Sequence, residues 1–231
     1  MKKIIITMIA ISLMLSLAAC GGENTNTNNT QNQTETSTEK NSSKVLPIEV
    51  KEFGYSMEDE YLYYSVILHN PNEDKAIELP SFRITARDAS GTPLATEEQT
   101  LSIIYPKQDF VHAFQAFDVD ELPATVDIEV LDAEEYNIKK VSMLDNPKYV
   151  PLSIVNSAFR TDSIVGEIQN DNDYDIESGV VTVVFRDADG KLIGGESTYV
   201  DSIKANATTP FDISIYNNFA TDNYEIYANI W

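Results

Sequence analysis

From Val45 onward, apolar and polar residues alternate along short runs of the chain, and clusters of Gly, Pro, Asn and Asp separate one run from the next. A period of two places successive side chains on opposite faces of a strand, as in a sheet that buries one of its faces. Runs of this kind, with breaks about every 8–12 residues, are typical of β-sandwiches and β-barrels. The pattern therefore predicts an all-β fold for residues 45–231.

The same pattern returns about one hundred positions later in the chain. The clearest match joins Arg87-Asp88-Ala89-Ser90-Gly91 to Arg186-Asp187-Ala188-Asp189-Gly190. In each copy the Asp can bond the backbone of a turn and the Gly can supply a positive φ, so we expect a tight turn at both places. The repeat predicts two tandem β-sandwich domains, at residues 45–145 and 146–231.

Strand alternation assigns the faces of the second strand in each copy. We expect a core face made by Leu62, Tyr64, Val66 and Leu68 in the first copy and by Ile164, Gly166 and Ile168 in the second. The opposite face of the first copy carries Tyr61, Tyr63, Ser65, Ile67 and His69.

A further frame is complete in the second copy: an Asn-x-Asn turn, an alternating strand that ends in Asp, a Gly turn, and a Pro-Phe strand. It reads Asn170-Asp171-Asn172, then Val183 to Asp187, then Gly190, and finally Pro210-Phe211. This frame resembles the bacterial FxLYD-type domains, small immunoglobulin-like sandwiches common on envelope lipoproteins. The signature pentapeptide is matched only at its aspartate, Asp187. The resemblance implies that the tandem domains are immunoglobulin-like, and it implies no catalytic residue.

The leader begins with Lys2 and Lys3, continues with an apolar stretch over residues 4–17, and closes on Leu17-Ala18-Ala19-Cys20. This order predicts a secretory signal peptide, residues 1–19, because the stretch is too short and wrongly flanked for a membrane-spanning helix. The leader resembles bacterial lipoprotein precursors, in which the cysteine is lipidated and becomes the mature N-terminus. The alternative is an ordinary signal with a chance cysteine.

Lipidation at Cys20 would anchor the protein to the extracytoplasmic face of the cell membrane, or to the outer membrane if the source cell has two membranes. A single acyl chain holds only marginally, whereas the two or more chains that the resemblance implies hold stably. Residues 20–44 comprise this cysteine and a tract rich in Asn, Thr and Ser without aromatic residues. Such a tract cannot offset its ordering entropy, so we predict a disordered tether that spans roughly 25–30 Å.

The chain carries 37 acidic and 16 basic residues, for a net charge of −21. Nucleic acid is therefore a poor partner, because phosphates would be repelled. Cys20 is the only cysteine, so the exported body has no disulfide and depends on packing for its stability.

One polar segment has the spacing of a calcium loop. Asp171, Asp173, Asp175 and Glu177 alternate with other residues, and a hard cation needs several oxygens from one tight turn. The match to an EF-hand fails where Ile176 replaces the glycine and Thr182 replaces the final glutamate. The segment predicts either a Ca²⁺ site, the only cofactor that the sequence suggests, or a solvated acidic turn.

Tyr61 and Tyr63 project from the face opposite the predicted core. Exposed aromatic rings stack on sugars and also anchor protein interfaces. They therefore define a candidate ligand face, unless they cover a neighbouring strand or the contact between the two domains.

The two histidines are far apart in sequence and have no patterned partners, so we expect no enzymatic activity. The sequence thus predicts a lipid-anchored envelope protein that acts as a non-catalytic protein-interaction module. The alternative is a surface module that binds a glycan or calcium.

Overall fold

A computed structural model describes residues 44–216 and 223–231. In this part of the chain almost all regular structure is β-strand, which confirms the all-β prediction. The exceptions are two short 3-10 helices, η1 (Glu135–Asn137) and η2 (Val141–Met143). Among the described residues, no helix has both the length and the apolar character needed to cross a membrane.

The strands fall into a first half and a second half. The first half contains β1 (Glu49–Glu58), β2 (Tyr61–His69), β3 (Lys75–Glu78), β4 (Ser81–Arg87), β5 (Pro93–Thr100), β6 (Ile103–Ile104), β7 (Asp109–Asp118), β8 (Thr125–Val130) and β9 (Ile138–Lys140). The second half contains β10 (Ser153–Phe159), β11 (Ser163–Asn170), β12 (Ile176–Arg186), β13 (Leu192–Ile203), β14 (Ala207–Ser214) and β15 (Tyr224–Ile230).

The first half is a sandwich of two antiparallel sheets, with strand orders β1-β2-β7 and β5-β4-β8. Leu62, Tyr64, Val66 and Leu68 on β2 are fully buried, as the alternation predicts, and they belong to the same core cluster as Phe82 and Ile84 on β4. A small sheet, β6-β3-β9, adds three short strands. Burying one face of each sheet against the other is what the period of two requires.

The second half repeats this arrangement, with strand orders β10-β11-β14 and β13-β12-β15. Its core cluster includes Ile164 and Ile168 on β11, Val183 and Phe185 on β12, and Phe211 on β14. The sequence repeat is therefore also a repeat of sheet topology. Ser43–Trp231 forms one compact unit, so a division into two separate domains stays a prediction.

The predicted turns are confirmed in both halves. The Asp187 carboxylate accepts hydrogen bonds from the backbone N–H groups of Asp189 and Lys191, both at 2.9 Å, and Gly190 has φ +80°. Asp88 likewise accepts from the N–H groups of Ser90 and Thr92, both at 2.8 Å. The hydroxyl of Ser90 also donates to Asp88, at 2.7 Å, and this bond is the main cause that lowers the pKa of Asp88, followed by the bond from the Thr92 N–H.

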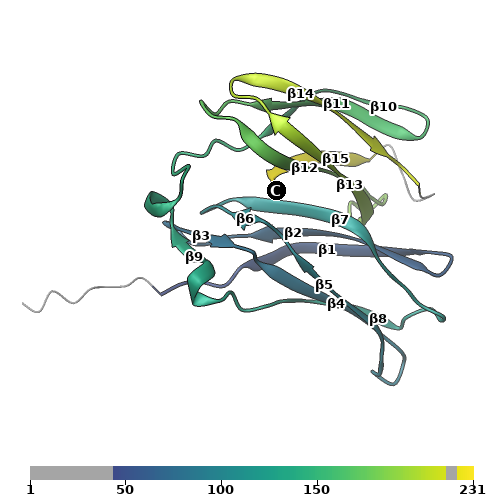
Figure 1. Ribbon diagram of the computed structural model, residues 1–231. Coiled ribbons are helices and arrows are strands. Elements are labelled where there is room, and N and C mark those ends of the chain that lie inside the picture. Colours follow the sequence, from purple (N-terminus) through teal and green to yellow (C-terminus); the bar gives the residue numbers. More distant parts are fainter. Residues whose placement is uncertain (1–43, 217–222) are drawn as a thin grey trace, which may run out of the picture. The chain divides into compact units, whose positions relative to one another are not determined.

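The two halves pack together through the outer faces of sheets β1-β2-β7 and β13-β12-β15. Ile67, Val111 and Ala113 from the first sheet form one buried cluster with Val184 and Leu192 from the second. The four larger sheets therefore lie in successive layers, from β10-β11-β14 to β5-β4-β8 (Figure 1). At Gly54 the two backbones approach so closely that a Cβ atom would overlap the carbonyl group of Leu192.

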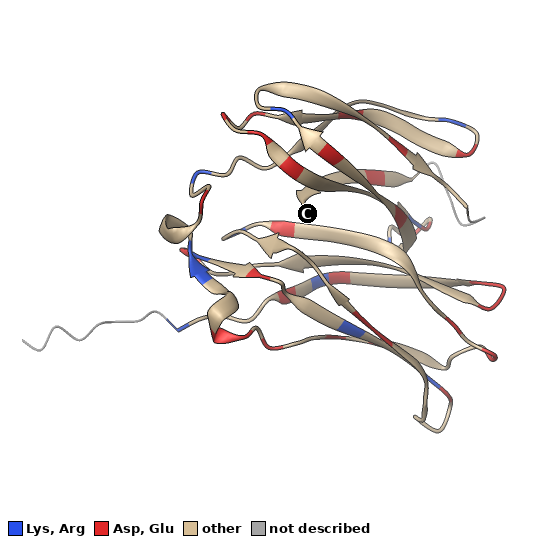
Figure 2. Cartoon of the chain, viewed as in Figure 1, with Lys and Arg blue, Asp and Glu red and all other residues tan. Residues whose placement is uncertain are grey.

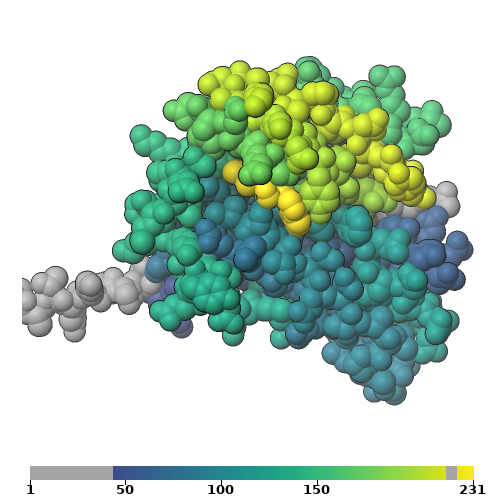
Figure 3. All heavy atoms as spheres, viewed as in Figure 1, coloured from purple at the N-terminus to yellow at the C-terminus, as the bar shows by residue number. Residues whose placement is uncertain are grey.

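Polar contacts and the last described strand also join the halves. Arg186 on β12 forms an ion pair with Glu52 on β1 at 2.6 Å. The ring of Trp231 stacks on His112 of β7, with centroids 5.9 Å apart, and Ser102 donates a hydrogen bond to the Ile230 carbonyl at 2.6 Å. Figure 3 shows the end of the chain, in orange-yellow, lodged between the green second half and the blue first half.

Candidate functional site

The predicted lipidation site, Cys20, lies outside the described residues, as do the leader and most of the tether. The other predicted site residues are described. They lie at two separate places, the turn between β11 and β12 and the amino-terminal part of β2.

The turn between β11 and β12 is built by two buried asparagines. The Asn170 side chain donates to the carbonyls of Tyr174 and Ile203, and its oxygen accepts from the N–H of Asn172 at 3.0 Å. The Asn172 side chain in turn holds the backbone of Val150, accepting from its N–H at 2.7 Å and donating to its carbonyl at 2.8 Å. The Asn-x-Asn turn is therefore a structural clamp on the segment that leads into β10.

The same clamp exists in the first half. Asn70 donates to the carbonyls of Lys75 and Ile104, while Asn72 bonds the backbone N–H of Leu46 at 2.9 Å and its carbonyl at 2.8 Å. Each clamp thus fixes the segment just before the first strand of its own half. The sequence showed the repeated turn, but its long-range partners are visible only in the fold.

The four predicted calcium-loop acids do not converge in this turn. Asp175 forms an ion pair with Lys204 at 2.7 Å and accepts from the N–H of Ala205, and these contacts lower its pKa. Asp171 accepts from the Gln169 side chain at 2.9 Å, and Asp173 and Glu177 are exposed. Within the described ranges, no group of three or more His, Cys, Asp or Glu side chains is placed to hold a metal ion.

Tyr61 and Tyr63 are partly exposed near the start of β2. Tyr61 pairs with Glu58 on β1 and Asp118 on β7, and nearby carboxylates, chiefly Glu60, raise its pKa. Tyr63 lies farther inside, where burial and then Glu196 of the second half raise its pKa. Of these two tyrosines, only Tyr63 lines the polar cleft between the halves that is described below.

The rest of this strand face differs from its expected exposure. Ser65 and Ile67, on the same face as Tyr61 and Tyr63, are buried. The reason is that the second half covers this face through Val184 and Leu192. A strand with both faces covered reads as a nearly continuous apolar run, and residues 64–68 of β2 are all buried.

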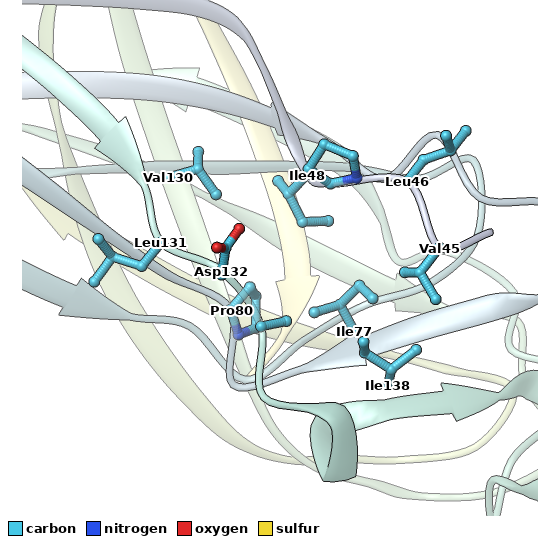
Figure 4. Close-up of a pocket in the computed structure, with 11 residues that line it drawn as sticks. Val45, Leu46, Ile48, Ile77, Pro80, Val130, Leu131, Asp132 and Ile138 are labelled. Carbon is cyan, nitrogen blue, oxygen red and sulfur yellow. The ribbon is translucent and has the colours of Figure 1, made fainter. Parts of the chain in front are cut away.

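An apolar pocket of about 450 Å³ opens at one end of the first sandwich (Figure 4). Its lining includes Val45, Ile48, Ile77, Val130 and Ile138, which come from widely separated parts of the chain. Asp132 is the only charged residue of the lining, and Figure 4 shows its carboxylate among the apolar side chains. A mainly apolar lining with a few polar groups that fix orientation is typical of ligand pockets.

The clamp of the first half, made by Asn70 and Asn72, holds part of the wall of this pocket in place. Leu46, a lining residue, is held by Asn72, and 44% of its surface is exposed. Further large apolar side chains are exposed in the adjoining segments, namely Leu79, Tyr136 and Met143. Sequence reasoning missed this pocket, although the apolar residues in Val45-Leu46-Pro47-Ile48 and Val130-Leu131 were a visible signal.

A second, polar cleft of about 590 Å³ is lined by residues from both halves. It includes Tyr63 and Phe114 from the first half and Glu196 and Asp212 from the second. Glu196 is only 8% exposed, and its burial raises the pKa of its carboxyl to about 7. Because so little of this side chain is exposed, its polar atoms depend on neighbouring protein groups rather than on water.

The two histidines lie in different environments. His112 is buried, and its ring contacts Tyr64, whose hydroxyl lies 2.9 Å from Nδ1. Burial lowers the pKa of His112 to about 4, so the ring is neutral at pH 7. His69 ends β2, and its Nδ1 lies 2.6 Å from the carboxylate of Asp109, the first residue of β7.

No protein-family model and no curated protein matches the chain. Among solved structures, the chain is similar to red sea bream transglutaminase, with 8% sequence identity and a TM-score of 0.28. The match covers 81% of this chain and 31% of that chain. A similarity this weak carries no argument about fold or activity.

Proposed function

We propose that this protein is a lipid-anchored lipoprotein of the cell envelope and that it acts as a non-catalytic protein-interaction module. Lipidation of Cys20 would hold it on the extracytoplasmic face of the membrane, and the tract over residues 20–44 would let the β-sandwich unit reach its partner. The partner class is a protein with an extended apolar segment.

The apolar pocket in Figure 4 is the observation that carries this proposal. A volume of about 450 Å³ can receive one or two apolar side chains of a partner, and Asp132 can accept a hydrogen bond from the partner's backbone. Leu79, Tyr136 and Met143, which lie in chain segments close to lining residues Pro80 and Ile138, are also exposed. Isolated exposed apolar residues are common, whereas several near one pocket favour an interface.

A non-catalytic role is supported by the environment of His112. Acid–base chemistry needs a titrating group that can reach its substrate. His112 is enclosed by aromatic rings, including Tyr64 and Trp231, and its pKa is far below neutral.

Site-specific photocrosslinking in the full-length, lipidated protein would test the proposal. A photoreactive residue at Ala133, which lines the pocket, should crosslink one envelope protein, and Ile138→Arg in the pocket wall should abolish the adduct. The same residue at exposed Ala124, just before β8, is the matched control. An identical pattern from both positions, or no protein adduct from Ala133, would reject the interaction surface.

The anchor can be tested separately. Replacing Cys20 with alanine should move the protein from the membrane fraction to the soluble extracytoplasmic fraction, because the acyl chains would be missing. If the variant stays in the membrane fraction after a high-salt wash, the lipoprotein assignment is wrong.

A further inference from the structure

Strand β8 forms one border of the sheet β5-β4-β8, which is the last of the successive layers in Figure 1. It pairs with β4 on one side, and no strand of the described chain pairs with its other side. A strand at such a border presents a row of unpaired backbone N–H and C=O groups to a further strand. The partner class proposed above has an extended segment, so this border bears on how that segment binds.

The register of β8 shows which of its backbone groups face outward. The Leu131 N–H donates to the Ser81 carbonyl at 2.9 Å, and β8 pairs with β4 without a register shift. Hydrogen-bonded pairs alternate with non-bonded pairs in an antiparallel ladder, so every second residue of β8 bonds toward β4. The residues between them turn their N–H and C=O groups to the free border, namely Val126, Ile128 and Val130.

The side chains of these same three residues pack against the core but are only partly buried. Their partners on the central strand β4 are completely buried, namely Val130's partner Phe82, Ile128's partner Ile84 and Val126's partner Ala86. The core of the first sandwich is therefore less well covered at this border than at its centre. Val130 also lines the apolar pocket, so the border is continuous with the surface proposed to bind the partner.

The outer face of this sheet carries charges that alternate in sign from strand to strand. Arg83 on β4 lies between Glu98 on β5 and Glu129 on β8, and it forms ion pairs with them at 2.6 and 3.2 Å. The Glu129 side chain is still 68% exposed, and that of Asp127, which pairs with Arg87, is 62% exposed. Opposite charges on neighbouring strands attract, so Lys or Arg on a further strand would continue the alternation.

Other borders of the sheets are covered or interrupted. On β15, which occupies the corresponding place in the second half, the Ile230 carbonyl accepts a hydrogen bond from Ser102 of the first half at 2.6 Å. On β1, which contacts β8, a register shift between Val50 and Glu52 interrupts the strand. Bulges, proline and lysine commonly protect a sheet border from pairing, and β8 has none of these.

We propose that the partner adds a β-strand to β8, and that this strand alternates apolar residues with Lys or Arg. Its apolar side chains cover Val126, Ile128 and Val130 and lead into the apolar pocket, while its basic side chains lie beside Asp127 and Glu129. This inference rests on the proposed protein-interaction function and specifies how the same surface recognises its partner. Acidic residues (red) outnumber basic ones (blue) along the drawn chain, which also attracts a basic segment over a longer range (Figure 2).

Peptide binding to the full lipidated chain in a zwitterionic detergent tests this strand pairing. The probe is a fluorescently labelled heptapeptide in which lysine and valine alternate, and its binding is followed by fluorescence anisotropy. One reference peptide has glutamate in place of lysine, and the other has the same composition with its valines together at one end. We expect the alternating basic peptide to bind at least roughly tenfold more tightly than either, because only this peptide matches both the strand faces and the charges of β8.

Charge reversal on the two sides of Arg83 provides a matched pair of variants. Glu129→Lys on β8 should weaken binding of the basic peptide roughly tenfold, since a peptide lysine would then lie beside a like charge. Glu98→Lys on β5 makes the same change on the other side of the same arginine and should leave the affinity unchanged. Thermal melting identifies a variant that fails to fold.

Amide hydrogen exchange, measured by NMR on the wild-type chain, keeps the test valid if a variant is unstable. The N–H groups of Val126, Ile128 and Val130 should exchange rapidly in the free protein and become protected when the basic peptide binds. Exchange along β5, at the opposite border of the same sheet, should not change.

Several outcomes would overturn the proposal. These are no binding of the alternating basic peptide, equal binding of either reference peptide, equal losses in the Glu98 and Glu129 variants, or outward N–H groups of β8 that are already protected in the free protein. Protection that rises with protein concentration would assign the border to a second copy, and protection independent of concentration would assign it to another segment of this chain. If strand pairing fails while Ala133 still crosslinks one envelope protein, only this inference is wrong, whereas the loss of the Ala133 adduct rejects the proposed interaction surface itself.

Discussion

Replacing Glu196 with glutamine should change how the stability of this protein depends on pH. The Glu196 carboxyl is buried on the edge strand β13, and burial raises its pKa from an ordinary 4.5 to about 7. A raised pKa means that the folded state holds the proton more tightly than the unfolded state does. The stabilising contribution is complete below about pH 4.5 and is lost as pH rises through 7. At 1.36 kcal/mol for each unit of pKa shift, the free energy of unfolding that is lost is about 3 kcal/mol.

His112 contributes an opposite dependence. Burial lowers its pKa from 6.5 to about 4, so its contribution is complete above pH 6.5 and is lost as pH falls through 4. Between about pH 4.5 and 6.5 the two effects have similar size and opposite sign. The wild-type protein should therefore show little net pH dependence from this pair, whereas each single variant should reveal the slope of the other residue.

The measurement is urea unfolding at a series of pH values, followed by the fluorescence of Trp231. This is the only tryptophan in the chain, and it stacks on His112 at the junction of the halves. In Glu196→Gln the free energy of unfolding should fall by about 2–3 kcal/mol on acidification from pH 6.5 to 4.5. In His112→Gln it should instead rise over the same range.

The exposed Glu177 on the neighbouring strand β12 offers a matched control, because Glu177→Gln makes the same chemical change outside the core. Its stability relative to wild type should be nearly independent of pH. The reasoning is refuted if Glu196→Gln and Glu177→Gln give parallel curves, since the burial of Glu196 would then have no effect on its proton affinity.

Three further predictions concern the packing and the turn. Gly54→Ala should destabilise the unit by at least about 3 kcal/mol in urea unfolding, because its Cβ would overlap the Leu192 backbone. A loss below about 1 kcal/mol would show that the two halves can move apart at little cost in free energy. Asn172→Ala and Asn72→Ala should each lower the free energy of unfolding by about 2–4 kcal/mol in the same measurement. Each variant removes a clamp and leaves buried backbone groups without partners. Unequal losses would show that the two clamps are not equivalent. Millimolar calcium should leave the melting temperature unchanged, because the acids of the turn between β11 and β12 do not converge. A rise in melting temperature that Asp171→Asn abolishes would instead establish a calcium site in this turn.

Several features could be predicted from sequence because they depend on short-range patterns. The period of two placed Leu62, Tyr64 and Val66 in the core, and the Asp-x-x-Gly segments identified both turns. The internal repeat predicted a repeated topology, since similar patterns of alternation and turns favour the same strand order.

Only the tertiary structure decided which surfaces remain open. Ile67 is buried, while its counterpart in the repeat, Glu167, is partly exposed, because the second half covers only the first of these two faces. The apolar pocket likewise joins Val45 to Ile138, and the polar cleft joins Glu97 to Asp212. Alternation is a property of neighbouring residues along one strand. Which strand faces come together depends on the shape and the packing energy of surfaces built from the whole chain.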